Sequence, residues 1–234
     1  MWPRLACAAV VELTYCIVTR TWLRAHFEGI ELELWTTAGR LASLVVFLLL
    51  FRSLIFSRSP KPNEAAHPLA LGAIALVLLT PVAVGNYALP NTATQVVFAV
   101  ASLAVALKEE ALYRGVLQNI IETRYGLLAS IVVSNLVFTL YHYGAQPFTL
   151  LNLTEIFAAG CILGLLYART GSLGLVVGLH AVNDAIWSFT PLLSSPLPRP
   201  LGSTLLLAAL GLCVMWAVRS NRRCTSLDRN AVIL

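Results

Sequence analysis

Long apolar segments recur along this chain, and they limit it to folds that have a lipid bilayer as their solvent. Each segment is bounded by charge, proline or glycine and is close to the length that an α-helix needs to cross the hydrocarbon. Hydrophobic residues make up 58% of the 234 residues and charged residues only 12%, which is more apolar surface than a soluble domain of this size can bury. The sequence therefore predicts an all-α fold, a polytopic transmembrane helical bundle of about eight spans. The predicted spans are 5–19, 41–56, 68–89, 94–121, 127–141, 151–168, 173–189 and 201–218.

Only short turns separate the predicted spans, at 125–126, 170–171 and the proline-rich 196–200 among others. We find neither a linker long enough to separate domains nor an internal repeat, so residues 1–234 are predicted to form a single integral membrane domain. The stretch 21–37 alternates glutamate with isoleucine and leucine beside two tryptophans. It is expected either to lie in the membrane interface or to form an ordinary polar loop.

Lysine and arginine are distributed unevenly between the two sides that eight spans define. Cytoplasmic loops carry the excess of these residues in membrane proteins, so both termini are expected on the cytoplasmic side of a cell inner membrane. The net charge of +5 then reflects topology, and no nucleic-acid partner is expected. The richer side has Arg4, Arg52, Arg58, Lys61, Arg124, Arg169, Arg219, Arg222, Arg223 and Arg229, and the poorer side has Arg20, Arg24, Arg40 and Arg199.

Ionisable residues inside the predicted spans carry the functional argument. A carboxylate or an arginine at the bilayer centre costs about 2.5 to 3.5 kcal/mol on insertion scales, so such residues usually face a polar cavity and pair with one another. The chain has three clusters of them: 108–114 in the fourth span, 138–142 at the end of the fifth, and 180–184 in the seventh.

Helical spacing predicts how these side chains are oriented. Glu110 and Arg114 are four residues apart in the favourable order for an ion pair, whereas Glu109 is turned about 100° away from Glu110. His180 and Asp184 share a helix face by the same spacing. Two histidines and an unpaired carboxylate from three helices are therefore expected to converge on one polar pocket, the usual way in which a helix bundle builds a site.

Structural explanations exist for several of these residues. Glu110 and Arg114 are better explained as a structural clamp than as a catalytic pair, because pairing satisfies both groups. His142 alone would also fit a satisfied histidine in an aromatic belt, and Phe138 is most simply a packing residue. Two further intramembrane carboxylates have no histidine nearby in the sequence and are expected to make interhelical hydrogen bonds, Glu12 and Glu155.

Together the three clusters resemble the signature of the CPBP family. This family groups type II CAAX prenyl endopeptidases with bacteriocin-processing and bacteriocin-immunity proteins, and it is also called the Abi family. The shared patterns are E-E-x-x-x-R, F-x-x-x-H and H-x-x-x-N/D, in that order on three membrane helices, and here they fall within residues 108–187. The resemblance implies a CAAX-type intramembrane endopeptidase, a hydrolase that performs proteolysis.

The family mechanism, carried over position by position, gives each cluster a role. Glu109 would activate a water with help from His142, and this water would attack the scissile carbonyl. His180 and Asp184 would face the developing oxyanion. The structural or supporting residues would be Glu110, Arg114, Asn183 and Phe138.

Asp184 is the position at which this chain departs from the commoner family pattern. Many members have asparagine there, whose amide donates a hydrogen bond, whereas an ionised aspartate only accepts. Two explanations stay open: a protonated Asp184 that donates to the oxyanion, or an ionised Asp184 that orients His180. The neighbouring Asn183 could offer an amide instead, although it points in a different direction from the helix.

No catalytic metal is expected, because the family is regarded as glutamate-type and the chain has no H-E-x-x-H motif. Zinc is the alternative cofactor, with Glu109, His142 and His180 as its ligands and one position open for water. The five cysteines show no C-x-x-C spacing, so neither a zinc knuckle nor a disulfide framework is predicted.

The expected partner, besides the lipid bilayer, is a peptide or a membrane-anchored protein tail that serves as substrate. Two other functions stay open, a catalytically silent bacteriocin-immunity or membrane scaffold protein and a small proton-coupled transporter. Intact Glu109, His142 and His180 argue against the silent protein. The lack of inverted repeats argues against the transporter.

Overall fold

The computed structural model describes residues 2–84, 93–143, 149–189 and 200–231, and every element within them is a helix. Two π-helices, η1 (Val18–Leu23) and η2 (Ala111–Gln118), and two short helices, α2 (Arg24–His26) and α4 (Pro62–Ala65), extend or connect the long ones. Each predicted apolar segment overlaps a long helix, with 85–89 of the third segment outside the described residues, so the all-α bundle is confirmed. The long helices are α1 (Trp2–Ile17), α3 (Gly29–Ile55), α5 (Pro68–Val84), α6 (Ala93–Glu110), α7 (Asn119–Tyr141), α8 (Leu150–Thr170), α9 (Leu173–Ser188) and α10 (Pro200–Ala231).

Several of these helices are long and apolar enough to cross a membrane, judged by length and composition. In the part of the chain that the structure describes, they are Pro3–His26, Gly29–Ile55, Leu150–Thr170 and Leu201–Val218, and Pro68–Val82 and Leu173–Ser188 are shorter apolar helices. The remaining long helices are α6, which carries the predicted site residues Glu109 and Glu110, and α7, which carries Glu122 and Arg124 in its first turns. The count of eight spans therefore stays a prediction.

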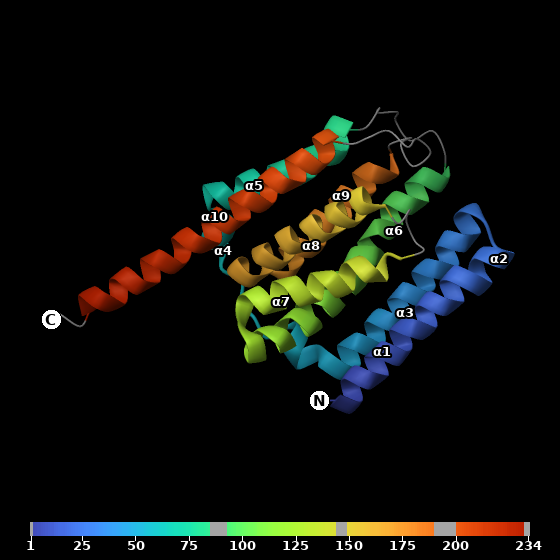
Figure 1. Ribbon diagram of the computed structural model, residues 1–234. Helices are drawn as coiled ribbons and strands as arrows, with labels where there is room; N and C mark the ends of the chain where they lie inside the picture. The colour runs from blue at the N-terminus through green and yellow to red at the C-terminus, as the bar shows by residue number, and fades with distance from the viewer. Residues whose placement is uncertain (1, 85–92, 144–148, 190–199, 232–234) are drawn as a thin grey trace.

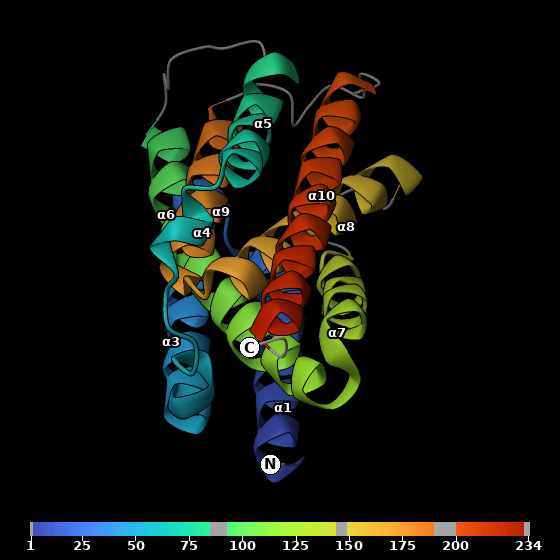
Figure 2. The ribbon, with the colours of Figure 1, turned by 90° about the vertical axis from the view of Figure 1, so that its left-hand side faces the viewer.

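The bundle is built in layers around α6 (Figure 1). α6 packs against α3 on one side and against α9 on the other. α10 packs on α5 and on α8, and α8 passes behind α10 in Figure 2. One apolar core joins α5, α8, α9 and α10 around Leu166 and Trp216, and a second joins α1, α3 and η2 around Phe47 and Val116. The predicted site residues on α6 and η2 are thus covered from both sides.

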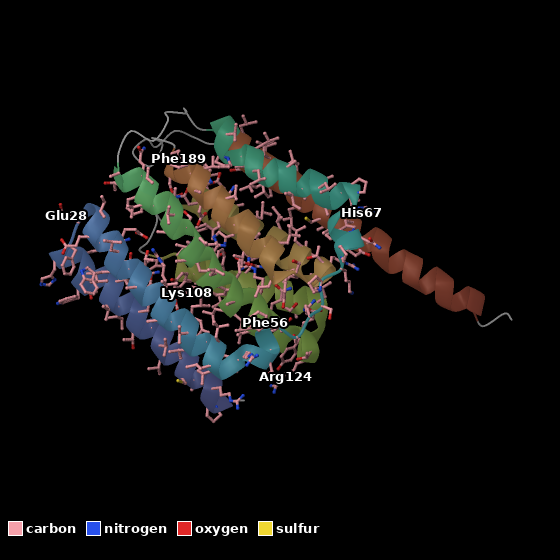
Figure 3. The ribbon with its side chains drawn as sticks, turned by 180° about the vertical axis from the view of Figure 1, so that it is seen from behind. Glu28, Phe56, His67, Lys108, Arg124 and Phe189 are labelled. Atoms are coloured by element: carbon pink, nitrogen blue, oxygen red, sulfur yellow. The ribbon has the colours of Figure 1, made fainter. Side chains whose placement is uncertain are left out.

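The chain alternates between two ends of the bundle. Glu28 and Phe189 lie at one end, Phe56 and Arg124 lie at the other, and Lys108 lies between them (Figure 3). This arrangement agrees with the predicted path, in which the turns near residues 28 and 189 share one side and those near residues 56 and 124 share the other.

Arg58 ties the connection after α3 to two other helices. Its guanidinium bonds the Glu122 carboxylate and donates to Asn119 Oδ1 at 2.8 Å, both on α7, and to Ala168 O at 3.2 Å on α8. It also lies 4.9 Å above the ring of Tyr167. The start of α4 is therefore fixed against the ends of α7 and α8.

The stretch 21–37 is helical except at Phe27 and Glu28, so the expected polar loop is wrong, and its position in the membrane interface stays a prediction. The first helix continues through η1 and α2 to His26, and α3 begins at Gly29, whose φ of 54° reverses the chain. The helix can carry the buried Glu33 because this carboxylate pairs with Arg40 on the same helix.

Two glycines make the predicted turns at 125–126 and 170–171. Gly126 has a φ of 80° and bends the chain within α7, and Gly171 has a φ of 64° and ends α8. A Cβ atom on Gly171 would lie 2.3 Å from Ser59 O, whereas one on Gly126 would meet nothing within 4 Å. The predicted turn at 196–200 lies outside the described residues up to position 199, and α10 begins at Pro200.

Gly171→Ala is expected to destabilise the protein more than Gly126→Ala. Both substitutions place a Cβ on a residue with positive φ, in the left-handed region at Gly171 and in a region that essentially only glycine adopts at Gly126. Such strain costs about 1 to 3 kcal/mol, but only Gly171→Ala also forces a backbone contact apart. Thermal unfolding in detergent micelles measures the difference. Equal melting temperatures for the two variants would contradict the close approach of the α3–α4 connection.

Candidate active site

Two adjacent buried glutamates lie where α6 passes into the π-helix η2. Glu109 and Glu110 are the last residues of α6, and both are buried together with Lys108. π-helical turns are rare and often mark functional sites, because they displace side chains from the ordinary α-helical positions. Here the π-helix η2 begins directly after the two carboxylates, and it contains Arg114.

Glu110 is engaged through both of its oxygens. Its Oε2 lies 3.1 Å from Arg114 Nε, and its Oε1 lies 2.7 Å from His180 Nδ1. The side chains of Glu110 and Arg114 are completely buried. The predicted ion pair is therefore present, and it extends to α9 through the histidine.

Arg114 reaches two residues that the sequence patterns did not single out. Its Nη2 donates to Gly160 O at 2.9 Å on α8 and to Asn135 Oδ1 at 3.2 Å on α7. A Cβ atom on Gly160 would lie 2.4 Å from Asn135 Oδ1, so a larger residue would have to displace the amide that accepts from Arg114. The sequence feature that could have indicated this close contact is the four-residue spacing of Gly160 and Gly164, which is typical of closely packed membrane helices.

Glu109 differs from its neighbour because, among the described residues, no arginine or lysine forms an ion pair with it. Among the described residues, Glu109 Oε2 is buried and has no hydrogen-bond partner. The nearest group of opposite character is His180 Nε2, at 3.9 Å. As predicted, the two glutamates point about 100° apart around the helix axis. The carboxylate of Glu110 is therefore held by its partners, while that of Glu109 is available as a base.

His180 connects the carboxylates from α9. While Nδ1 faces Glu110, Nε2 lies 3.3 Å from Asp184 Oδ2 one turn further along the helix. The Asp184 side chain is 35% exposed and that of His180 only 9%, so the aspartate lies toward the open side of the cluster. Asn183 is directed elsewhere, because its Nδ2 donates to Val77 O on α5 at 2.9 Å.

His142 lies at the end of α7 on the far side of a phenylalanine ring. The Phe138 ring centroid is 4.7 Å from that of His142 and 6.3 Å from that of His180, edge-on to both. His142 Nδ1 lies 2.8 Å from Phe138 O; a carbonyl only accepts, so Nδ1 carries the proton and Nε2 is left as an acceptor. Within the described residues His142 makes no hydrogen bond or ion pair with Glu109.

Lys108 forms a second buried polar cluster that the sequence analysis did not foresee. Its Nζ bonds the Glu12 carboxylate on α1, donates to Tyr141 Oη at 2.8 Å and lies 3.9 Å above the Tyr15 ring. The signal for it was Glu12, an acid that interrupts the first apolar segment. The other such acid, Glu155, accepts a hydrogen bond from Ser203 at 2.8 Å, so both make the expected interhelical contacts.

The alternative zinc ligands are not gathered into a set. Among residues 2–84, 93–143, 149–189 and 200–231, no three histidine, cysteine, aspartate or glutamate side chains are grouped to hold a metal ion. Glu109 and His180 are neighbours, while His142 is separated from His180 by the Phe138 ring.

A bundle of apolar helices that buries acid, base and arginine side chains together is typical of an integral membrane protein with an internal polar site. The family model described as Rce1-like, type II CAAX prenyl endopeptidase Rce1-like, matches residues 90–186. This match confirms the resemblance to the CPBP family of intramembrane proteases, and it supports a CAAX-type intramembrane endopeptidase with a peptide or protein substrate. Comparisons with curated proteins and with solved structures gave no match.

Glu110→Gln is expected to lower the free energy of unfolding by about 3 to 5 kcal/mol, because it leaves the buried Arg114 charge without its partner. Glu122→Gln is the matched control, since its pair with Arg58 is partly exposed and such pairs contribute about 1 kcal/mol or less. Unfolding in mixed detergent micelles measures both. A loss for Glu110→Gln no larger than that of the control would contradict the central role of the pair.

Proposed function

We propose that the protein is a glutamate-type intramembrane endopeptidase that cleaves a peptide or a membrane-anchored protein tail with a water activated by Glu109 and His142. The observation that supports this most directly is the division between the two glutamates. Glu110 is held by Arg114 at 3.1 Å and by His180 at 2.7 Å, whereas in the described part of the chain Glu109 has only His180 Nε2, at 3.9 Å, as a partner in an ion pair. Only Glu109 is left to act as a base.

In this proposal the water lies between Glu109 and His142. A general base must come within hydrogen-bonding distance of the proton that it removes, either directly or through one water. His142 Nε2 is an acceptor because Nδ1 donates to Phe138 O, so the imidazole and the carboxylate together orient and deprotonate the water. The Phe138 ring contacts both His142 and His180 and keeps the two imidazoles apart.

His180 and Asp184 stabilise the oxyanion in the same proposal. His180 donates Nδ1–H to Glu110 and directs Nε2–H toward the side where Asp184 is exposed. Two roles stay open for Asp184, a protonated carboxyl that donates to the oxyanion or an ionised one that orients His180. Donors placed in this way stabilise the charge that develops in the transition state.

The expected location is the cell inner membrane with both termini cytoplasmic. The structure supports the underlying path because Phe56 and Arg124, from turns predicted on the basic side, lie at the same end of the bundle, opposite Glu28 and Phe189 (Figure 3). Cytoplasmic loops are the ones that carry an excess of basic residues.

Alanine at Glu109, His142 or His180 is expected to abolish cleavage, and the three losses should not add, because the residues act as one unit. Proteoliposomes with internally quenched peptides that end in a CAAX sequence, with and without a farnesyl group, measure the rate. Glu155→Ala is the control: it removes another intramembrane carboxylate, which bonds Ser203 outside the site, and it should cleave normally.

Full activity in any of the three alanine variants would remove that residue from the mechanism. The same assay with a strong chelator tests the zinc alternative. Activity that is lost on chelation and restored by zinc would replace the glutamate mechanism with a metal-dependent one.

Asp184→Asn is expected to retain cleavage and to extend it to higher pH, because asparagine donates a hydrogen bond at every pH. Asp184→Ala should lower the rate about a hundred- to a thousandfold, as the loss of one oxyanion donor typically does. Rate against pH for both variants is the measurement. A dead asparagine variant would show instead that an ionised Asp184 orients His180.

A further inference from the structure

The end of α7 presents backbone carbonyls on either side of His142. α7 ends at Tyr141, and the next two amides turn back into the helix, from His142 N to Thr139 O at 3.1 Å and from Tyr143 N to Leu140 O at 3.0 Å. The carbonyls of a helix C-terminus have no partner within the helix and need one from outside.

Arg20 supplies that partner from the first helix. Its Nη2 donates to Tyr141 O and its Nη1 donates to Tyr143 O, so one guanidinium holds the residues immediately before and after His142. The two donors of a planar guanidinium have a fixed spacing that a flexible amine does not, and a positive charge is favourable at a helix C-terminus.

Tyr141 is held at its ring as well as at its backbone. The Arg20 guanidinium carbon lies 5.4 Å from the centre of the Tyr141 ring, and Lys108 Nζ donates to the phenol oxygen at 2.8 Å. This ring stands edge-on to His142, with centroids 5.6 Å apart and an interplanar angle of 89°. The imidazole is therefore bounded by the Tyr141 ring on one side and the Phe138 ring on the other.

We propose that Arg20 is a positioning residue for His142. The first helix then helps to set the geometry of the site. This inference rests on the proposed function, because it gives Arg20 a purpose only if His142 orients the attacking water. Arg20 lies outside residues 90–186, the region that matches the family model. It acts through the backbone of Tyr141 and Tyr143 and does not meet the substrate.

Arg20→Met should lower kcat on the order of a hundredfold with KM little changed, because misplacing one group by about 1 Å can cost that much in rate. Arg20→Lys should restore part of the loss, since it keeps the charge but not the two-pronged donor. Arg4→Met is the matched control. Arg4 lies on the same helix and donates to the carbonyl of Leu50 at 3.4 Å, on α3 and not on α7.

A second readout does not depend on cleavage. Diethyl pyrocarbonate acylates accessible imidazoles, and mass spectrometry gives the rate for each histidine separately. In Arg20→Met the rate at His142 should rise several-fold relative to His67, which stacks on Trp216 with ring centroids 6.0 Å apart and reports whether the fold is intact. Arg4→Met should leave the ratio unchanged.

The outcomes separate the two proposals. A lower kcat together with faster modification of His142 supports Arg20 as a positioning residue. An unchanged modification ratio in Arg20→Met overturns that role, whatever happens to the cleavage rate. If the unsubstituted protein cleaves none of the peptides, the proposed function fails, while the modification ratio still decides whether Arg20 holds His142.

Discussion

The buried pair of Glu110 and Arg114 is the interaction on which the rest of the site depends. A lone charge at this depth would cost several kcal/mol, and further polar groups offset part of the cost of the pair by bonding Arg114 Nη2 and Glu110 Oε1. Those groups come from three other helices: Asn135 on α7, the Gly160 carbonyl on α8 and His180 on α9. Satisfying one ion pair therefore dictates how closely α7 and α8 approach and which way the imidazole on α9 faces.

The two adjacent glutamates show how a helix gives neighbours different tasks. Consecutive positions differ by about 100° around the axis, so Glu110 turns toward Arg114, while Glu109 has only His180 as an ion-pair partner within the described residues. In the proposed mechanism the fixed carboxylate orients His180, and Glu109 acts as the base. Neither could do both, because an oxygen already committed to a cation is a poor base.

The all-α fold and the position of the three motifs could be predicted from the sequence because lipid imposes direct signals. Apolar length marks a helix, and an ionisable residue within it marks a site. The partners of those residues could not be predicted, since Asn135, Gly160 and Arg20 lie in helices whose mutual packing the sequence does not specify. For the same reason, only the structure shows that Asn183 points toward α5. Residues 21–26 and 29–37 are helical, although their charges suggested a loop. Ion pairs such as Glu33 with Arg40 satisfy those charges within the helix.

The contact between Lys108 and Glu12 has a consequence for biogenesis. The stretch formed by α6 and η2 carries Lys108, Glu109, Glu110 and Arg114, and each charge near the bilayer centre opposes insertion by about 2.5 to 3.5 kcal/mol. Such a segment is a poor substrate for the translocon by itself. The carboxylate of Glu12 is synthesised first and, once α1 is in the bilayer, offers Lys108 a counter-ion. Glu12 is thus in the membrane before the segment that contains Lys108 has left the ribosome.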